Sequence, residues 1–395
     1  MRLQTWFVGI AVVCAGCGGD DDATGEVALP AEECRKESLD DSAYSVPSVI
    51  DHRDEAYGAL HNPTGRPIGG GPGYGAWVTR PAAPVRTAAA LRSAVAAARA
   101  GDVVYVADDA SIDLSRTSRD HRDGATSCLG YGIDIPAGVT IASGRGQGGS
   151  RGALLYTTTK EKCALFRPLG SARITGLRLR GPDPNVEQSD PALCAKEARG
   201  IQARFSQVSR FDIEIDNNEL SAWPGAAVSG ENVIGLRVHH NWVHHNRRQE
   251  HDGTCWKDGE RWAYGLGYGV SISRGHALVE GNNFDNNRHD VASDGAPGSQ
   301  YEARYNVVGL GAIQHSFDVH GGADRGTCND VAGTFVLIHH NTVLQTNKPA
   351  VHVRGVPLRG AWIYKNQVRH TSASAAFKQS NAFGRFYVED NLLGG

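Results

Sequence analysis

Residues 335–341 read Phe-Val-Leu-Ile-His-His-Asn, an apolar run that ends on an asparagine. The same ending recurs along the second half of the chain, with gaps of 23, 41, 24, 35, 25 and 25 residues. Four gaps are a period of 23 to 25 residues, and the other two are that period plus a loop. A repeat of this length cannot bury its apolar face alone, so it stacks on its neighbours. The asparagines are Asn218, Asn241, Asn282, Asn306, Asn341, Asn366 and Asn391.

The composition is that of a folded protein rich in turns. The chain has 395 residues, 49 of them glycine, and a formal charge of −3. Because the charge is nearly balanced, we expect no nucleic-acid partner held by a basic surface. A solenoid grows along one axis, so this length is compatible with a single domain. We expect that domain to span 46–395 and to be a monomer.

The N-terminus has the pattern of an export signal. Residues 1–17 contain Arg2, an apolar run and small residues before Cys17. The stretch Cys-Ala-Gly-Cys at 14–17 resembles a bacterial lipoprotein processing site, which makes Cys17 the lipidated residue; a plain secretory signal is the alternative. Residues 18–45 fit a flexible tether. We therefore expect an exported protein, periplasmic or at the cell surface, anchored to the outer membrane through lipid alone.

Six cysteines follow the signal, and an even number in an exported chain indicates disulfides. Cys255 and Cys328 each lie in one of the two long gaps of the repeat. If these loops leave the same side of the stack, the two cysteines form a pair. The pattern leaves the other pairings open.

The first half of the domain predicts a helix followed by short strands. Residues 46–85 are rich in Gly and Pro and are expected to form a loop around the start of the fold. Over 87–100 we expect a helix that is capped by Thr87, has Leu91 and Val95 on one face, and stops at Gly101. The strands expected next are 103–106, 132–135, 139–141, 153–155, 164–166 and 173–179.

The stretch LRSAVAAARAGDVVYVADD at 91–109, with the strand and Gly-rich turn at 139–152, resembles the opening of right-handed parallel β-helix proteins of the pectate-lyase-like superfamily. The asparagine repeat resembles the asparagine ladder of such folds. The resemblance implies an all-β, right-handed parallel β-helix with an N-terminal capping helix. It does not fix the activity, because the superfamily includes lyases, hydrolases, epimerases and non-catalytic proteins. Their catalytic motifs do not align here, so no residue roles are carried over.

The repeated asparagines are interpreted as structural. An asparagine at the bend tolerates left-handed backbone, and its amide can bond to the coils on either side. The His-His pairs at 239–240, 244–245 and 339–340 are interpreted as turn residues, because adjacent residues of a strand point to opposite faces.

A second strand recurs through 269–275, 288–295, 315–321, 351–355 and 375–378. Side chains alternate along a strand, so the apolar residues point inward and the polar ones outward. Stacking then brings polar residues of adjacent coils within about 5 Å of each other. The predicted outward patch consists of Asp290, Asp294, Asp318, His320, His352, Arg354 and Lys378. His289 and His315 lie at the strand entrances, and the pattern leaves their orientation open.

Acid, imidazole and cation together are what proton abstraction next to a carboxylate needs. The leading hypothesis is a polysaccharide lyase that cleaves a uronate-containing polymer by β-elimination. His320 or His352 would be the base, Arg354 or Lys378 would neutralise the uronate, and Asp318 with Asp294 would orient a histidine or hold a divalent cation such as calcium. The alternatives are a non-catalytic glycan-binding or cell-surface structural lipoprotein, in which the patch is ordinary surface, and a glycoside hydrolase using two aspartates.

The two long loops, 246–265 and 309–333, are expected to frame the patch. The first carries a mixture of rings and cations that suits stacking on sugars and pairing with uronates, although the rings alternatively pack the loop onto its coil. These candidate substrate-binding residues are Arg247, Trp256, Trp262 and Tyr264. The spacing of His315, Asp318 and His320 is a weak metal signal, since on an extended strand His315 faces away from the other two.

Overall fold

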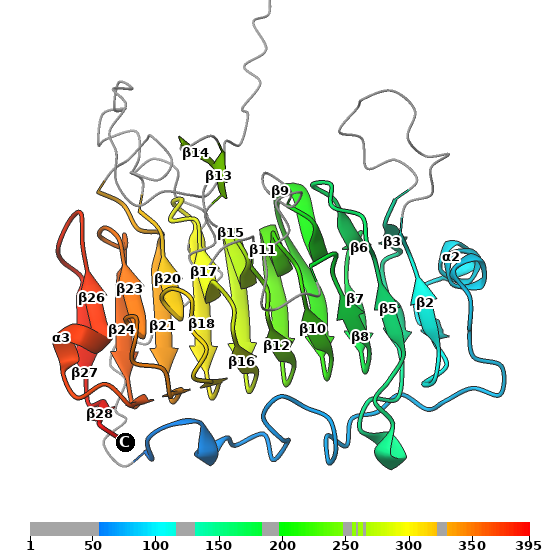
Figure 1. The fold of residues 1–395 in the computed structure, drawn as a ribbon, viewed down its shortest axis with the longest axis horizontal. Coiled ribbons are helices and arrows are strands. Elements are labelled where there is room, and N and C mark those ends of the chain that lie inside the picture. The colour runs from blue at the N-terminus through cyan, green and yellow to red at the C-terminus, as the bar shows by residue number, and fades with distance from the viewer. Residues whose placement is uncertain are drawn as a thin grey trace, which may run out of the picture.

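The computed structural model describes residues 55–115, 131–183, 197–247, 266–321 and 330–395, with the backbone alone of 255–257 and 260–263. The chain is all-β as expected, and its strands pair in two long parallel sheets stacked along one axis (Figure 1). This arrangement is consistent with the expected parallel β-helix. The predicted signal segment 1–17, with Cys17, and the predicted tether 18–45 lie outside the described residues. Among the helices of the described part, none is long and apolar enough to cross a membrane.

Each coil, meaning one circuit of the backbone, contributes to three columns of strands. The first column enters the asparagine turn: β1 (Val103–Tyr105), β4 (Val139–Ala142), β7 (Ala172–Thr175), the ends of β9 (Arg199–Asp216), β11 (Ala226–His239) and β15 (Tyr268–Glu280), then β18 (Ser299–Arg304), β21 (Phe335–His339), β24 (Gly360–Tyr364) and β27 (Phe386–Glu389).

The second column leaves that turn and forms the ten-stranded sheet: β2 (Ser111–Asp113), β5 (Leu154–Tyr156), β8 (Arg178–Arg180), β10 (Glu219–Ser221), β12 (Trp242–His244), β16 (Asn283–Asp285), β19 (Val307–Val308), β22 (Thr342–Val343), β25 (Gln367–Val368) and β28 (Leu392–Leu393).

The third column consists of β3 (Ile133–Ile135), β6 (Ala164–Pro168), the starts of β9, β11 and β15, then β17 (His289–Ser293), β20 (Phe317–Val319), β23 (Val351–Val353) and β26 (Phe377–Gln379). Short elements outside the columns are η2 (Ala59–His61), α2 (Ala88–Ala97), η4 (Gln147–Gly149), α3 (Ala373–Ala376) and the antiparallel pair β13 (Cys255–Lys257) and β14 (Glu260–Ala263).

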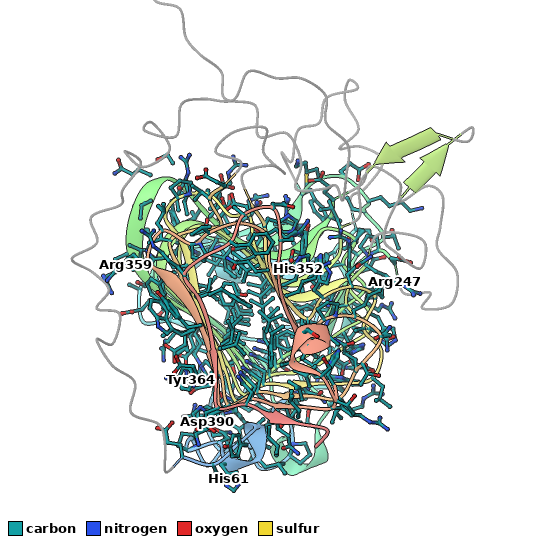
Figure 2. The ribbon with its side chains drawn as sticks, turned by 90° about the vertical axis from the view of Figure 1, so that its left-hand side faces the viewer. His61, Arg247, His352, Arg359, Tyr364 and Asp390 are labelled. Atoms are coloured by element: carbon teal, nitrogen blue, oxygen red, sulfur yellow. The ribbon has the colours of Figure 1, made fainter. Side chains whose placement is uncertain are left out.

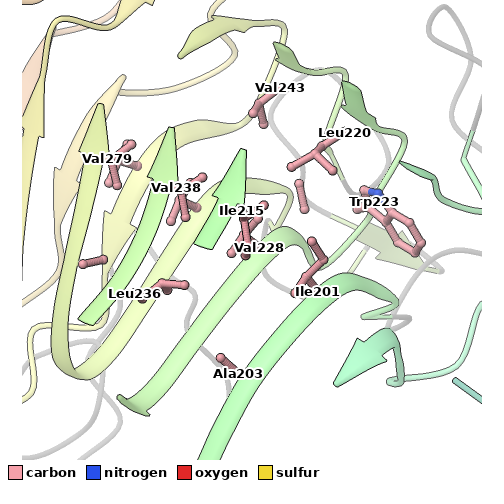
Figure 3. Packing of buried hydrophobic residues seen from close by; sticks show 14 of the residues in the cluster. Ile201, Ala203, Ile215, Leu220, Trp223, Val228, Leu236, Val238, Val243 and Val279 are labelled. Carbon is pink, nitrogen blue, oxygen red and sulfur yellow. The ribbon is translucent and has the colours of Figure 1, made fainter. Parts of the chain in front are cut away.

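The core lies inside the coils, where like residues stack in register. In the third column one buried position is apolar in seven successive coils. Figure 3 shows side chains of this interior meeting from several strands. Parallel strands buried on their inner face require such apolar positions, since no water reaches them. The stacked residues are Ile201, Val228, Val270, Val291, Phe317, Val351 and Phe377.

The predicted asparagine ladder is present and buried. In each rung after Asn218, the asparagine Oδ1 atom accepts from the backbone N–H and the Nδ2 of the preceding asparagine, and its Nδ2 donates to a carbonyl in the first column. For Asn282 these distances are 3.0 and 3.0 Å from Asn241, and 2.8 Å to the Val238 carbonyl. The pattern continues through Asn306, at 2.9 and 3.0 Å from Asn282. The amides therefore satisfy buried polar groups of the turn.

The left-handed residue of this turn precedes the asparagine, which corrects our expectation that the asparagine itself bends the chain. Positive φ angles occur at His240 (52°), His340 (53°) and Lys365 (52°), and Gly281 takes the same place at 62°. His245, at 54°, has this role in a neighbouring turn. One residue of each His-His pair is thus a turn residue, as the sequence indicated.

The capping helix α2 closes one end of the stack (Figure 1). Thr87 accepts a hydrogen bond from the Ala90 amide, and Leu91 with Val95 is buried, all as expected. The helix ends at Ala97, three residues before the predicted boundary, because Ala98 is already extended.

Residues 55–85 do not wrap the start of the fold as predicted; they run along the asparagine turns from the last coils back towards the first. Gly58 donates to the Lys365 carbonyl, Gly69 to the Gly281 carbonyl, and Tyr74 to Asp216 at 2.7 Å. Figure 2 shows His61 of this segment beneath Asp390 and Tyr364, whereas His352 lies on the other side of the coil. The hydrogen bonds that hold this path come from single residues without a fixed spacing, which explains why periodicity did not reveal it.

The predicted strand 173–179 is two strands, β7 and β8. Gly176 adopts φ 71° between them, and Leu177 donates to the Oδ1 of Asn218 at 3.0 Å. The ladder turn therefore begins one coil earlier than the first repeated asparagine.

We expect Asn306→Ala to lower the free energy of unfolding by about 3 kcal/mol, because the buried Asn282 backbone N–H loses the oxygen that accepts from it and the Val279 carbonyl loses a donor. The matched control is Asn391→Ala at the last rung, where water reaches the freed groups and we expect about 1 kcal/mol. Urea unfolding followed by circular dichroism measures both; equal losses would contradict the ladder's structural role.

Candidate functional site

The outer side of the third column carries one row that contains part of the predicted patch, with Ala292 where that patch had Asp290 and Asp294. Ser271, Ala292, Asp318, His352 and Lys378 occupy one position in successive coils, paired in register. Because their strands are hydrogen-bonded neighbours, residues far apart in the chain become side-by-side groups. The row provides the frame of the candidate site.

Asp318 is the centre of the cluster. Its Oδ2 atom accepts from Arg354 Nη2 at 2.6 Å and lies 2.8 Å from His320 Nε2. The Arg354 guanidinium also lies 2.8 Å from that same imidazole nitrogen. The carboxylate of Asp318, the guanidinium of Arg354 and the imidazole of His320 therefore lie together, as the sequence pattern predicted for these three residues.

Two further histidines approach the same carboxylate. His315 Nδ1 lies 3.4 Å from Asp318 Oδ1, and His289 Nε2 lies 3.6 Å from Oδ2. The expectation that His315 faces away from Asp318 is therefore wrong. Strand β20 begins at Phe317, so alternation along the strand does not govern His315.

Aromatic rings form one wall of the cluster. Tyr268 stacks on His289 with centroids 5.6 Å apart, and His289 stacks on His315 at 5.5 Å. The Arg288 guanidinium covers the Tyr268 ring at 5.9 Å. Tyr268, His289 and His315 thus form one stack of rings beside Asp318, whereas the His320 ring is nearly perpendicular to His289.

His352 stands at the edge of the cluster. Its Nδ1 lies 3.2 Å from His315 Nε2, and its Nε2 lies 2.8 Å from Ser380 Oγ. The next residue of the row, Lys378, is exposed to solvent. His352 and Lys378 are therefore the point at which the buried cluster meets the surface.

Burial and charge set the protonation of these groups. Burial lowers the pKa of His289 well below its usual value and that of His352 to about 3. For Asp318, burial acts to raise the pKa, but the Arg354 guanidinium and the nearby imidazoles outweigh it and hold the pKa well below its usual range. At neutral pH the Asp318 carboxylate is therefore ionised beside the Arg354 guanidinium, and the His289 and His352 imidazoles are neutral.

The cluster is buried, which differs from the solvated patch that the sequence predicted. The exposed fraction is 0% for Asp318, 1% for His320 and 4% for Arg354. Strand alternation separates the inner from the outer side of a coil, but it does not reveal what covers the outer side.

Two predicted members lie outside the cluster. Asp290 accepts from Asn287 Nδ2 at 2.9 Å at the turn between the second and third columns, and burial raises its pKa to about 7. Asp294 accepts from Ser273 and Ser299 at 2.7 and 2.6 Å and holds its own turn. Both carboxylates have structural partners of this kind.

The loop candidates are only partly described. Arg247 is half-buried beside Gly267, and burial lowers its pKa. Trp256 and Trp262 lie on the backbone pair β13 and β14, and their side chains, like Tyr264, are outside the described residues. The Cys255–Cys328 disulfide falls there too and stays a prediction.

A second, shorter asparagine ladder was missed. Asn246 bonds to Asn287 through Nδ2 at 2.8 Å, and the Trp223 amide donates to Asn246 at 3.1 Å. The signal was present in the sequence, because Asn246 and Asn287 each follow a rung of the main ladder by five residues. This ladder leads to the start of β17 and so positions His289. Tyr268, Arg288 and Ser380 were also missed; the register of Tyr268 with His289 would have revealed the first of them.

The cluster does not fit calcium. Calcium binds six to eight oxygens, whereas among the described residues Asp318 is the one carboxylate here and the other ligand atoms are imidazole nitrogens. Imidazole with carboxylate suits a divalent transition metal instead.

No protein-family model matches the chain, and no curated protein is similar enough to count as a relative. The fold and the candidate site therefore rest on the chain's own residues.

We expect Arg354→Met to lower the free energy of unfolding by about 3–5 kcal/mol, because it leaves the Asp318 carboxylate buried without its cation. The control is Arg204→Met, which breaks a half-exposed pair with Glu231 and should cost about 0–1 kcal/mol. Chemical unfolding compares the two variants, and a loss at Arg354 as small as that at Arg204 would show that Asp318 does not depend on this cation.

Proposed function

We propose that this protein is an exported, carbohydrate-active enzyme that cleaves a uronate-containing polysaccharide by β-elimination. We further propose that it is a right-handed parallel β-helix of the pectate-lyase-like superfamily, lipidated at Cys17. One observation supports the reaction above all: a neutral imidazole, His352, stands next to an exposed cation, Lys378, in adjacent coils.

In this reaction His352 Nε2 takes the proton from the carbon next to the uronate carboxylate. The electron pair of that C–H bond forms the new carbon–carbon double bond, and the bond from the neighbouring carbon to the glycosidic oxygen breaks. The proton on His352 then passes to the leaving oxygen, so that charge and atoms balance. Lys378 pairs with the carboxylate and stabilises the enolate-like charge that develops.

The buried groups hold His352 rather than touch the substrate. Arg354 and His320 are both engaged with Asp318, so the roles that the sequence gave them fall to Lys378 and His352. His315 links Asp318 to His352, with contacts of 3.4 and 3.2 Å. A glycoside hydrolase is less well supported, because the second carboxylates considered, Asp290 and Asp294, are bound to turn residues.

The burial of His352 favours a second candidate, non-catalytic glycan binding. An imidazole that no substrate reaches cannot transfer a proton, and His352 is only 5% exposed. Lys378 would then be part of a binding surface alone. Binding to uronate polymers without product release distinguishes this role from the lyase.

We expect the protein to release unsaturated products from at least one polymer in a panel containing galacturonate, glucuronate and mannuronate chains. His352→Gln should lower the initial rate at least about 100-fold, since it removes the base. Lys378→Ala should lower kcat/KM at least about fivefold, with part of the loss in kcat, because it removes both the charge pair with the carboxylate and the stabilisation of the developing charge. Ultraviolet absorbance of the unsaturated uronate measures both.

The control is His276→Gln, which replaces a histidine of the first column that packs against Phe335, and its rate should match the wild type. If the folded wild-type protein releases no product from any polymer, or if His352→Gln retains full activity, the elimination mechanism is wrong.

A further inference from the structure

Three side chains of two adjacent coils bring one possible metal-ligand atom each within 4.8 Å of one another: His289, His315 and Asp318. The nearest pairs are separated by 3.4 Å, from His315 Nδ1 to Asp318 Oδ1, and by 3.6 Å, from His289 Nε2 to Asp318 Oδ2. Ligands held at about 2.1 Å around a tetrahedral ion lie about 3.4 Å apart. The distance from His315 to Oδ1 matches this value, and His289 lies close to the other oxygen of the same carboxylate.

The hydrogen bonds of His289 direct a lone pair into this space. Its Nδ1 lies 2.8 Å from the His315 carbonyl oxygen, which only accepts, so Nδ1 carries the hydrogen. In the neutral ring Nε2 is then an acceptor facing Asp318. Within the described part of the chain, Nε2 of His289 and Oδ1 of Asp318 are buried without hydrogen-bond partners. Two buried acceptors without donors in one cluster are unfavourable, and a cation bound to both would satisfy them.

We propose that this is a binding site for a divalent first-row transition ion such as zinc, with His289 Nε2, His315 Nδ1 and Asp318 Oδ1 as ligands. Two imidazoles and a carboxylate are a donor set that such ions prefer. The bond from His289 Nδ1 to a carbonyl oxygen is the kind of support that orients metal-binding histidines. Arg354 occupies only the other carboxylate oxygen, Oδ2. Three protein ligands leave a fourth position.

A second group of similar composition provides the contrast. Glu214, Asp216 and His239 also lie close together. There, however, both Asp216 oxygens accept from Arg173, at 2.8 and 2.6 Å, and His239 Nε2 lies 2.9 Å from Glu214. The Asp216 oxygens and His239 Nε2 already have partners, so this group is an ion-pair network. It serves as an internal control.

Metal at His315 Nδ1 would also fix the hydrogen on His352. His315 Nε2–H would donate to His352 Nδ1 across 3.2 Å, which leaves the one hydrogen of His352 on Nε2, facing Ser380. In the proposed elimination that nitrogen has to accept a proton. The ion would therefore inhibit the elimination, a consequence that rests on the proposed function, whereas binding itself does not.

The test is zinc binding to the purified full-length protein, stripped with a chelator and then titrated in competition with a chromogenic chelator. We expect one equivalent to bind with Kd below about 1 µM, and calcium not to compete. His289→Gln and His315→Gln should each weaken that affinity at least about 100-fold. His239→Gln and His276→Gln should leave it unchanged. Cobalt(II) in place of zinc should give a visible spectrum that both site variants lose.

Circular dichroism checks that each variant is folded. Because there are two independent site variants, the test still works if one of them does not fold. The proposal is wrong if the folded wild type takes up no equivalent of zinc, if both site variants bind as the wild type does, or if His239→Gln removes the binding instead. Polymer cleavage is a separate readout. If the protein binds zinc but cleaves no polymer, with or without the metal, the elimination is refuted and the metal site stands.

Discussion

The structure depends on one interaction, the buried asparagine amide that joins each coil to the next. Each amide accepts from the preceding rung and donates to a first-column carbonyl, so it fixes both the height and the register of its coil. Register in turn decides the site. Asp318, His352 and Lys378 are separated by more than a coil of chain, and only in-register pairing of β20, β23 and β26 makes them neighbours.

Periodic features were predictable from the sequence, and non-periodic ones were not. The ladder, the parallel columns and the capping helix α2 follow from side chains that repeat at fixed spacing or from local capping. The path of residues 55–85 follows from single polar contacts, such as Gly58 with Lys365, which have no sequence signature. The break at Gly176 was missed because its coil has no asparagine of its own in the ladder.

The same division applies to the site. The row through Asp318, His352 and Lys378 was predicted, because alternation and stacking are enough to place it. The positions of His315 and Asp290 were not predicted. Both residues lie where a turn enters a strand, and there their side-chain contacts override the alternation of side chains. The strand pattern also did not predict that the cluster is buried, because burial depends on what covers the coils rather than on the coils themselves.

The cluster is hard to explain as a stabilising device. A buried carboxylate with its guanidinium gives little net stability compared with apolar residues of similar size, and lone pairs without donors lower it further. The neighbouring coils show that the fold does not need charge here, because the same position in the row is Ser271 in one and Ala292 in the next. Asp318 and the imidazoles around it therefore occupy a place that a small neutral residue can fill. Their convergence at the point where His352 meets the exposed Lys378 is better explained by binding or chemistry than by folding.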